Sequence, residues 1–312
     1  MNGRLLIRQL LNRTVKIPPH AITRHLLKSL WRQPRLQDAL GYHVQPYRYD
    51  SAIPTTLDVD LDALKRRRAL PGLRLDPEVY LGSLEKISQF APELATIPDH
   101  AAPGLDFWFR NGAYGELDAA TLYCMVRHLK PKRLIEVGCG FSSRMIDRAC
   151  GRNREEGHPC ESIFIEPYPS QRFLDSPPAG EFMKTKIELV PLEIFQRLRK
   201  DDILFIDTSH VLKTQNDCCR ELLEIIPSLA PGVVVHVHDI FTPYDYPAEW
   251  LFERQFPFNE QYALECLLSD SPRYEVILPV FLLWTEHRAK MKQLLPSAEN
   301  DVAAFWFGIR SE

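Results

Sequence analysis

The segment that most constrains this chain is residues 133–143, RLIEVGCGFSS, where an apolar run ends in two closely spaced glycines. The apolar run predicts a buried β-strand, and the residues after the glycines predict a helix. Gly138 and Gly140 carry no Cβ, so they allow a tight turn and a close approach of a ligand to the backbone. Such a strand–turn–helix unit directs backbone N–H groups and a helix N-terminus at a ligand, which predicts a binding site here.

The kind of ligand is indicated by Glu136, which lies two positions before the first glycine. A carboxylate at this place disfavours a pyrophosphate, which is already doubly negative, and suits a ligand with an amine and a positive charge. Ser143 stands where the dinucleotide-binding motif has its third glycine. The turn therefore favours S-adenosylmethionine (SAM) over a dinucleotide.

From about residue 105 onward, strand-like and helix-like segments alternate. The strand-like segments are continuous apolar runs, which is typical of parallel strands buried on both faces. The alternation predicts an α/β fold, a doubly wound Rossmann-like sheet with helices on both sides. We expect strands at residues 133–137, 162–166, near 186–190, 203–207 and 232–238, and helices at 142–150, 192–199, 214–226 and 260–269.

The ordered set of motifs resembles that of the class I SAM-dependent methyltransferases. The glycine turn resembles motif I of that family, Glu166 ends a strand where the family places an acidic residue, and Asp207 ends a second strand. Residues 238–247 (HDIFTPYDYP), Trp250 and residues 259–262 (NEQY) resemble a bacterial subgroup that acts on small molecules.

The resemblance implies a seven-stranded sheet, with strand six at residues 274–278 and an antiparallel last strand within 302–308, preceded by an N-terminal helical cap. It also implies methyl transfer from SAM to an oxygen or nitrogen of a small molecule, in secondary metabolism. Three alternatives stay open. They are intramolecular attack on the aminopropyl chain of SAM, which forms azetidine-2-carboxylate and methylthioadenosine, a SAM-binding protein without catalysis, and a dinucleotide oxidoreductase.

The resemblance also implies which residues bind the cofactor. Glu166 matches the acid that binds the ribose hydroxyls, and the N–H of Cys139 is expected to face the ligand. Residues 107–114, which contain three aromatic side chains in a row, are interpreted as a lid over SAM or as a hydrophobic plug for the N-terminal region. The predicted cofactor-binding residues are Asn111, Tyr114, Glu136, Gly138, Cys139, Gly140, Ser142, Ser143, Glu166 and Asp207.

Asp207, His210, His238 and Asp239 lie at predicted strand ends and form the predicted catalytic set. Methyl transfer needs alignment of the reactants and removal of one proton, which a histidine with a pKa near neutrality can accept. Asp207 and Asp239 also fall where catechol-type methyltransferases hold Mg²⁺, but Ile240 replaces their amide ligand. The histidines suit Zn²⁺, Mn²⁺ or Fe²⁺ better than Mg²⁺. A divalent metal is therefore left open.

The composition limits the choice of partners. A hydrophobic fraction of 45% and a charged fraction of 25% are typical of a globular protein, and the net charge of −3 gives no reason to expect nucleic-acid binding. The seven cysteines show no ligand-like spacing, which favours a reducing, cytoplasmic location. No apolar run approaches the roughly 18–20 residues that cross a bilayer. We expect a small-molecule substrate and leave a homodimer open.

We divide the chain into an N-terminal cap and connector, residues 1–104, and a SAM-binding catalytic domain, residues 105–312. Residues 1–40 carry eight Lys or Arg against one acid. Apolar residues have helical spacing within residues 6–10 and 22–30. This segment fits a basic amphipathic helix that contacts a membrane or partner, a transit peptide, or cap helices packed on the catalytic domain.

Overall fold

The computed structural model describes residues 20–45, 51, 53–295 and 302–310. The chain divides into two compact units, residues 1–54 and 55–312. In the smaller unit the described residues form two helices, α2 (His20–Trp31) and α3 (Pro34–Leu40). The helical spacing predicted within residues 22–30 is confirmed by α2, whereas the spacing within residues 6–10 lies outside the described residues.

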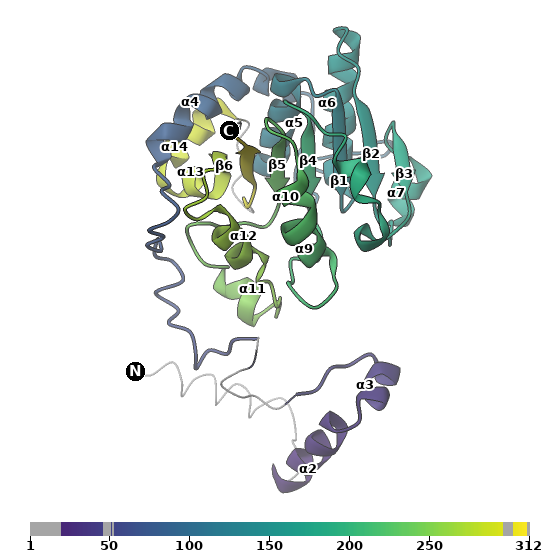
Figure 1. The fold of residues 1–312 in the computed structure, drawn as a ribbon, viewed down its shortest axis with the longest axis vertical. Coiled ribbons are helices and arrows are strands. Elements are labelled where there is room, and N and C mark those ends of the chain that lie inside the picture. The colour runs from purple at the N-terminus through teal and green to yellow at the C-terminus, as the bar shows by residue number, and fades with distance from the viewer. Residues whose placement is uncertain (1–19, 46–50, 52, 296–301, 311–312) are drawn as a thin grey trace. The chain divides into compact units, whose positions relative to one another are not determined.

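The described part of the larger unit contains a seven-stranded sheet with the order β3-β2-β1-β4-β5-β7-β6 (Figure 1). Neighbouring strands from β3 to β5 are parallel, and β7 is antiparallel to both β5 and β6. This topology confirms the predicted Rossmann-like sheet with an antiparallel last strand. The strands are β1 (Arg133–Val137), β2 (Glu161–Ile165), β3 (Glu181–Met183), β4 (Ile203–Ile206), β5 (Val234–Val237), β6 (Tyr274–Pro279) and β7 (Phe305–Ile309).

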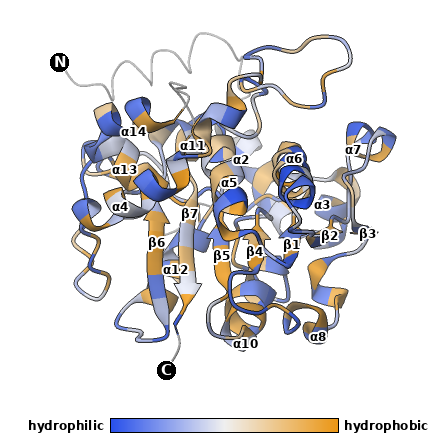
Figure 2. Ribbon diagram, turned by 90° about the horizontal axis from the view of Figure 1, so that it is seen from above, coloured by the Kyte–Doolittle hydropathy of each residue, from blue (hydrophilic) through white to orange (hydrophobic). Residues whose placement is uncertain are grey.

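Helices surround this sheet because its central strands carry apolar side chains on both faces. Figure 2 shows strands coloured mainly as hydrophobic, with many hydrophilic residues on the helices around them. The α-helices are α4 (Pro77–Ser88), α5 (Glu116–Leu129), α6 (Phe141–Glu155), α7 (Gln171–Asp175), α8 (Leu192–Phe195), α9 (Asp217–Arg220), α10 (Ile226–Ser228), α11 (Ala248–Phe252), α12 (Glu260–Leu268), α13 (Val280–Glu286) and α14 (Arg288–Leu294). Two 3₁₀ helices, η1 (Ala91–Leu94) and η2 (Ile187–Leu189), and the π-helix η3 (Glu221–Ile225) complete the set of described helices.

The third strand is not where the sequence predicts it. We expect a strand near residues 186–190, but β3 lies earlier and pairs with Ile163–Ile165 of β2. Residues 187–189 form η2 instead, so this prediction is wrong. Ile187 and Val190 are buried while Leu189 is 75% exposed, and this spacing of three suits a turn rather than the alternation of a strand.

Residues 55–104 belong to the larger unit, although the sequence groups them with the N-terminal region. Helix α4 packs against α5, β6, α13 and α14, and it buries Leu84 and Ile87. The apolar face of α4 is therefore covered by the same unit that contains the sheet. The boundary between the compact units consequently falls between Pro54 and Thr55.

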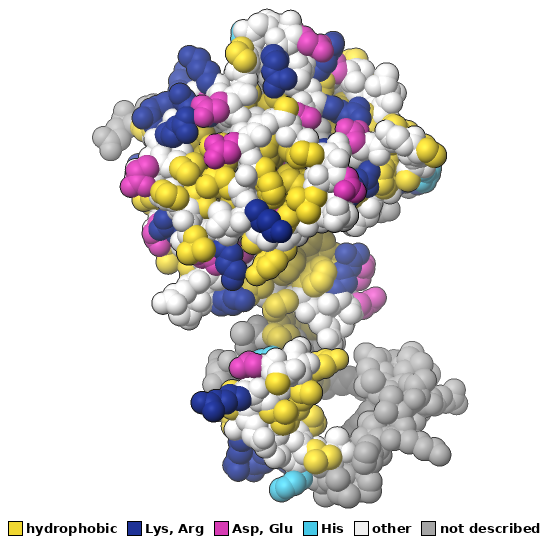
Figure 3. All heavy atoms as spheres, turned by 90° about the vertical axis from the view of Figure 1, so that its right-hand side faces the viewer, with side chains coloured by type: hydrophobic (Ala, Val, Ile, Leu, Met, Phe, Trp, Pro, Cys, Tyr) yellow, Lys and Arg dark blue, Asp and Glu magenta, His cyan; other side chains and the backbone are white. Residues whose placement is uncertain are grey.

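The surface of the larger unit mixes charges of both signs. In the face shown in Figure 3, Lys and Arg side chains lie among Asp and Glu side chains and do not gather by sign. All seven cysteines are free thiols. Among the described residues, none of the helices combines the length and apolar composition that a bilayer-spanning helix needs.

Candidate active site

Two cavities open at the carboxyl ends of the parallel strands in the larger unit. The smaller, of about 490 Å³, borders the ends of β1, β2 and β4. The larger, of about 650 Å³, borders the ends of β4 and β5 and the loops that follow β5. Open α/β sheets bind ligands at this edge, beside the point where the strand order reverses. In this sheet the order reverses between β1 and β4.

Three of the predicted cofactor-binding residues, Gly138, Glu166 and Asp207, line the smaller cavity. Two further segments complete its wall, residues 186–188 after β3 and residues 213–217 after β4. Residues 186–188 were not predicted to line a cavity, because the sequence predicts the third strand there. In the structure they follow β3 and lie at the same edge of the sheet.

Gly138 lets the end of β1 pass very close to the end of β4. It has a φ of 83°, and a Cβ at this position would overlap the backbone carbonyl oxygen of Asp207. Glycine tolerates both the left-handed conformation and the contact. Gly140 differs, because no described atom lies within 4 Å of a Cβ built there. Gly138 is therefore the glycine that brings Asp207 beside the turn.

Glu136 lies behind the glycine turn and lines neither cavity. Its carboxylate is fully buried and accepts hydrogen bonds from the hydroxyls of Ser142 at 2.6 Å and Ser143 at 2.5 Å. Burial raises its pKa to about 8, although the two hydroxyls favour the ionised form. These contacts tie β1 to the first turn of α6. In this structure Glu136, Ser142 and Ser143 support the turn from inside.

The buried carboxyl of Glu136 predicts a pH-dependent stability. Its pKa is 4.5 in the reference state and about 8 when folded, so the folded chain holds the proton more tightly. Glu136 therefore leaves the free energy of unfolding unchanged below about pH 4.5, where it is protonated in both states. The free energy of unfolding then falls progressively as the pH rises to about 8. Glu136→Gln cannot ionise. We expect its free energy of unfolding, relative to that of the natural chain, to rise by about 2–4 kcal/mol between pH 5 and pH 8.

Urea unfolding of both proteins at pH 5 and pH 8 measures this difference, and all other titrating groups cancel between them. A difference that stays constant across the range would show that Glu136 is already ionised at pH 5.

Glu166 faces the smaller cavity from the end of β2. Its Oε1 accepts a hydrogen bond from the backbone N–H of Tyr168 at 2.6 Å, and its Oε2 accepts one from the N–H of Cys139 at 3.2 Å. The predicted ligand-facing N–H of Cys139 is thus directed at Glu166. The two bonds fix the carboxylate between the glycine turn and the cavity.

The aromatic segment before α5 packs into the protein and does not cover the smaller cavity. Asn111 closes its own turn, because its side chain donates to the carbonyl of Trp108 and accepts from the N–H of Tyr114. The Tyr114 ring is buried, and its centroid lies 4.9 Å from that of the His238 ring. Neither Asn111 nor Tyr114 lines a cavity, whereas Phe109, Gly112 and Ala113 line the larger one. The arrangement fits the predicted plug better than a lid over the smaller cavity.

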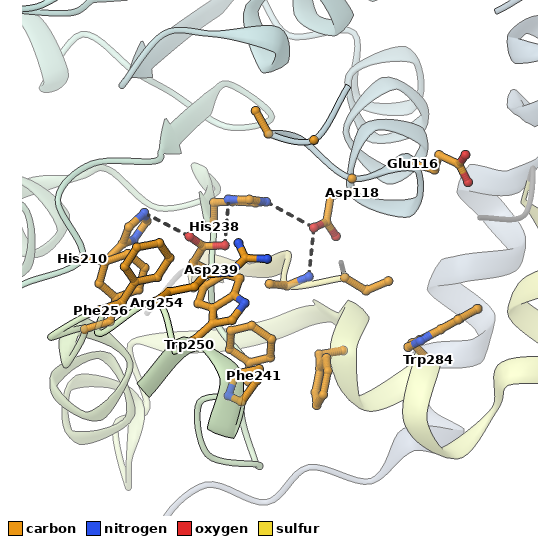
Figure 4. A pocket seen from close by; sticks show the side chains of 18 of the residues that line it. Glu116, Asp118, His210, His238, Asp239, Phe241, Trp250, Arg254, Phe256 and Trp284 are labelled. Carbon is orange, nitrogen blue, oxygen red and sulfur yellow. Dashed lines mark hydrogen bonds and ion pairs between the residues drawn. The ribbon is translucent and has the colours of Figure 1, made fainter. Parts of the chain in front are cut away.

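The larger cavity has several aromatic side chains in its walls and a polar floor. Figure 4 shows Phe241, Trp250, Phe256 and Trp284 around it, with Arg254 among them. Arg254 is held by Glu249 at 2.9 Å. The floor is formed by acidic side chains and histidines from the ends of β4, β5 and the start of α5.

The structure brings the four predicted catalytic residues together, with His210, His238 and Asp239 in the larger cavity and Asp207 in the smaller one. His210 Nε2 lies 3.1 Å from Asp207 Oδ1 and 3.3 Å from Asp239 Oδ2. His238 Nδ1 lies 3.5 Å from Asp207 Oδ1 and 3.2 Å from Asp239 Oδ1. His210 and Asp239 have positive φ values of 56° and 57°, an uncommon backbone conformation that recurs at functional sites. We name these four residues the His/Asp cluster.

Two further carboxylates hold the outer nitrogens of the histidines. Glu260 Oε2 lies 3.0 Å from His210 Nδ1, and Asp118 Oδ2 lies 3.2 Å from His238 Nε2. Asp118 in turn accepts hydrogen bonds from the backbone N–H groups of the segment before β7. No role is predicted for Asp118 or Glu260 from the sequence, because the sequence does not show that α5 and α12 pack beside the strand ends.

The carboxylates change the protonation expected of the histidines. Burial lowers the pKa of His210, but hydrogen bonds to Asp207 and Glu260 outweigh it, and the pKa lies well above its ordinary value. The same balance raises the pKa of His238, through Asp239 above all. Both rings are therefore protonated near neutral pH. The sequence predicts a histidine base with a pKa near neutrality, whereas here the pKa values of both histidines are raised and a proton exchanged at this site belongs to the whole cluster.

Two groups of described residues offer a set of metal ligands. Ligand atoms of Asp207, His210 and Asp239 lie within 4.8 Å of one another, as do those of Cys218, Glu221 and Glu260. The first group borders the cavities, whereas the second is buried and lines neither.

Comparison with known sequences gives one family match and one relative. Residues 135–240 match a family described as a methyltransferase domain, and this segment runs from β1 past the end of β5. An uncharacterized protein of Archaeoglobus fulgidus is 25% identical over 185 residues, which cover 56% of this chain and 82% of the relative.

Solved structures with partial overlap include two methyltransferases. CalS11, a TDP-rhamnose 3'-O-methyltransferase of calicheamicin biosynthesis, overlaps with a TM-score of 0.41 at 13% identity, over 77% of this chain and 99% of CalS11. MycE of the mycinamycin pathway, in complex with Mg, SAH and mycinamycin VI, overlaps with a TM-score of 0.32 at 14% identity, over 72% of this chain and 53% of MycE.

Proposed function

We propose that this protein transfers the methyl group of SAM to an oxygen or nitrogen atom of a small molecule. The observation that carries the proposal is the position of Asp207. Its side chain lines the smaller cavity, and it lies 3.1 Å from His210, which lines the larger one. A cofactor in the smaller cavity and an acceptor in the larger one would meet at the His/Asp cluster.

The smaller cavity fits SAM by volume and by chemistry. About 490 Å³ lies within the range of roughly 300–1,000 Å³ that is usual for small-ligand sites. Glu166 offers acceptor oxygens to the ribose hydroxyls, and Gly138 lines the same cavity. Bound SAM supplies an electrophilic methyl group on a positively charged sulfur.

The larger cavity binds and orients the acceptor. Its aromatic walls exclude water and restrict the orientation of a bound small molecule, which aligns the reacting atoms. Because both histidines already carry a proton, the carboxylates of the His/Asp cluster take up the proton that the acceptor atom loses, and burial raises the pKa of Asp239, which favours its protonated form. Each histidine contacts both aspartates, so the cluster accepts this proton as a unit.

The larger cavity also separates this proposal from intramolecular attack on the aminopropyl chain. That reaction needs no second substrate and no room for one, whereas about 650 Å³ remains beside the cluster. Mass spectrometry of the protein incubated with SAM alone tests the difference. We expect SAM to persist without an acceptor and S-adenosylhomocysteine to form with one. Release of methylthioadenosine without an acceptor would contradict methyl transfer.

Glu166→Ala tests the cofactor cavity. A charged hydrogen-bond acceptor contributes about 1.5–3 kcal/mol, so we expect SAM to bind roughly 10- to 100-fold more weakly. Isothermal titration calorimetry measures the change. Glu155→Ala is the matched control, because Glu155 is exposed at the end of α6 and lines neither cavity. Unchanged affinity in Glu166→Ala would place the SAM ribose elsewhere.

A further inference from the structure

We propose that the smaller unit binds the surface of bilayers that contain anionic phospholipids, with α2 lying in the plane of the interface. The proposed methyl transfer gives no role to this part of the chain, which lines neither cavity. Membrane binding through α2 needs neither SAM nor an acceptor. The two activities can therefore be present or absent independently of each other.

The two halves of α2 carry different kinds of side chain. With about 3.6 residues per turn, side chains three or four positions apart lie on the same side of a helix. One half of the surface is formed by Leu26, Leu27, Leu30 and Trp31. The opposite half carries Arg24 and Lys28, and the next residue on this side is Arg32. α2 contains no Asp or Glu, so every Lys or Arg charge on it stands without an acidic neighbour in the same helix.

The apolar half of α2 is exposed. Leu26 and Leu27 are 60% and 50% exposed, and Trp31 is exposed as well. On α3, Leu36 and Leu40 are one helical turn apart and are also exposed. In Figure 3, hydrophobic side chains of this unit gather along one side, and Lys and Arg side chains lie beside them. Exposed apolar side chains that gather in this way mark an interaction site.

Hydrogen bonds fix the turn between α2 and α3. Gln37 is polar but buried. Its Nε2 donates to the carbonyl oxygens of Leu30 at 3.1 Å and Trp31 at 3.2 Å. Its Oε1 accepts a hydrogen bond from the backbone N–H of Val44 at 2.6 Å. These bonds hold the end of α2 against α3, so the apolar half of α2 keeps a defined shape while it is exposed.

The charge of this segment favours an anionic partner. Residues 20–45 carry four Lys or Arg against one acid, whereas residues 46–312 carry 30 Lys or Arg against 40 Asp or Glu. Anionic phospholipids attract Lys and Arg side chains that lie close to the bilayer surface. A second copy of α2 would cover the apolar half but would add its own positive charges beside these, and like charges repel. An anionic bilayer instead offers a counterpart to both halves of the helix.

The length and composition of α2 suit a position in the interface rather than across the bilayer. Its 12 residues extend about 18 Å, whereas the hydrocarbon core of a bilayer is about 30 Å thick. An amphipathic helix with Lys and Arg on one side and Leu and Trp on the other lies in the interface, with its apolar side among the acyl chains. Trp31 lies at the border of the two halves, where an aromatic ring contacts the headgroups.

Co-sedimentation of the full-length protein with lipid vesicles tests the proposal. One kind of vesicle contains phosphatidylcholine alone, and the other contains phosphatidylserine as about 30% of its lipid. We expect an affinity for the anionic vesicles that is at least about tenfold higher, and a loss of this difference in concentrated NaCl, which screens surface charges. A natural chain that stays in the supernatant with both kinds of vesicle, or binds both equally, would overturn the proposal.

A charge variant tests the basic half of α2. It combines Arg24→Gln, Lys28→Gln and Arg32→Gln, and Gln preserves helix propensity. Each charge near the surface contributes a factor of about five, so we expect binding to the anionic vesicles to weaken about 100-fold. The matched control changes three exposed basic residues of the larger unit and should bind as the natural chain does. It combines Lys132→Gln, Arg154→Gln and Lys184→Gln. Equal weakening in the two variants would overturn the assignment of the contact to α2.

A second variant, Leu26→Glu with Leu27→Glu, tests the apolar half. We expect it to stay in the supernatant with the anionic vesicles, whereas Leu223→Glu, at an exposed leucine of the larger unit, should bind as the natural chain does. Circular dichroism checks the helix content of each variant, and urea unfolding checks the larger unit. Undiminished binding by the double variant would overturn the proposal. A natural dimer that binds no vesicles and becomes monomeric in this variant would assign the apolar half to a second copy of the chain instead.

Discussion

Replacing His238 by alanine is expected to slow methyl transfer about a thousandfold while SAM still binds. His238 contacts the buried Asp118 and the half-buried Asp207 and Asp239, so its loss leaves three carboxylates without its positive charge. Groups that act as a unit lose nearly all their effect when one member is removed. The ring lies in the wall of the larger cavity and not of the smaller one, which is why SAM affinity should persist.

The measurement is the rate of S-adenosylhomocysteine formation with an acceptor found in a library of hydroxyl and amine compounds. Calorimetry with SAM on the same preparation shows that the variant is folded. His158→Ala, which changes an exposed histidine, should react at the natural rate. Turnover of His238→Ala within a factor of about ten of that rate would exclude a role for His238 in the proton step.

The strand-end residues could be brought together from the sequence because the fold gives them a common position. Parallel strands that are buried on both faces end at one edge of the sheet, so Glu166, Asp207 and His238 must lie near one another once the strands are recognised. The structure places them at that edge. The antiparallel direction of the last strand was predicted from the resemblance alone, because the periodicity of a sequence does not indicate the direction of a strand.

The supporting residues could not be predicted in the same way. Glu260 begins α12 and Asp118 lies in the first turn of α5, and nothing in their local sequence shows which histidine they face. Their contacts with His210 and His238 depend on how these helices pack on the sheet. The raised pKa values of both histidines follow from these contacts. The protonation state of the site therefore could not be predicted from the sequence either.

The predicted role of Glu136 shows a different limit. The residue type and its place before Gly138 are compatible both with contact to a ligand and with support of the turn. Burial decides between them, and burial depends on the hydroxyls of Ser142 and Ser143 turning inward. The sequence contains all three residues but not the direction of their side chains.

Gly138→Ala is expected to abolish SAM binding and to lower the free energy of unfolding by about 3–5 kcal/mol. The left-handed conformation alone costs a residue with a Cβ about 1–2 kcal/mol. The larger cost comes from the overlap of that Cβ with the carbonyl of Asp207, which is backbone and cannot rotate away. β1 and β4 must therefore separate at the edge where Asp207 lines the smaller cavity.

Gly151→Ala is the matched control for this prediction. Gly151 lies within α6, has no described atom within 4 Å of an added Cβ, and should become more stable by about 0.5–1 kcal/mol because alanine favours a helix. Urea unfolding and calorimetry with SAM measure both variants. If Gly138→Ala binds SAM and unfolds as the natural chain does, the turn does not hold β1 against β4, and Asp207 is not positioned by it. Loss of binding in Gly138→Ala alone would show that SAM binding depends on this turn, because both variants add the same methyl group.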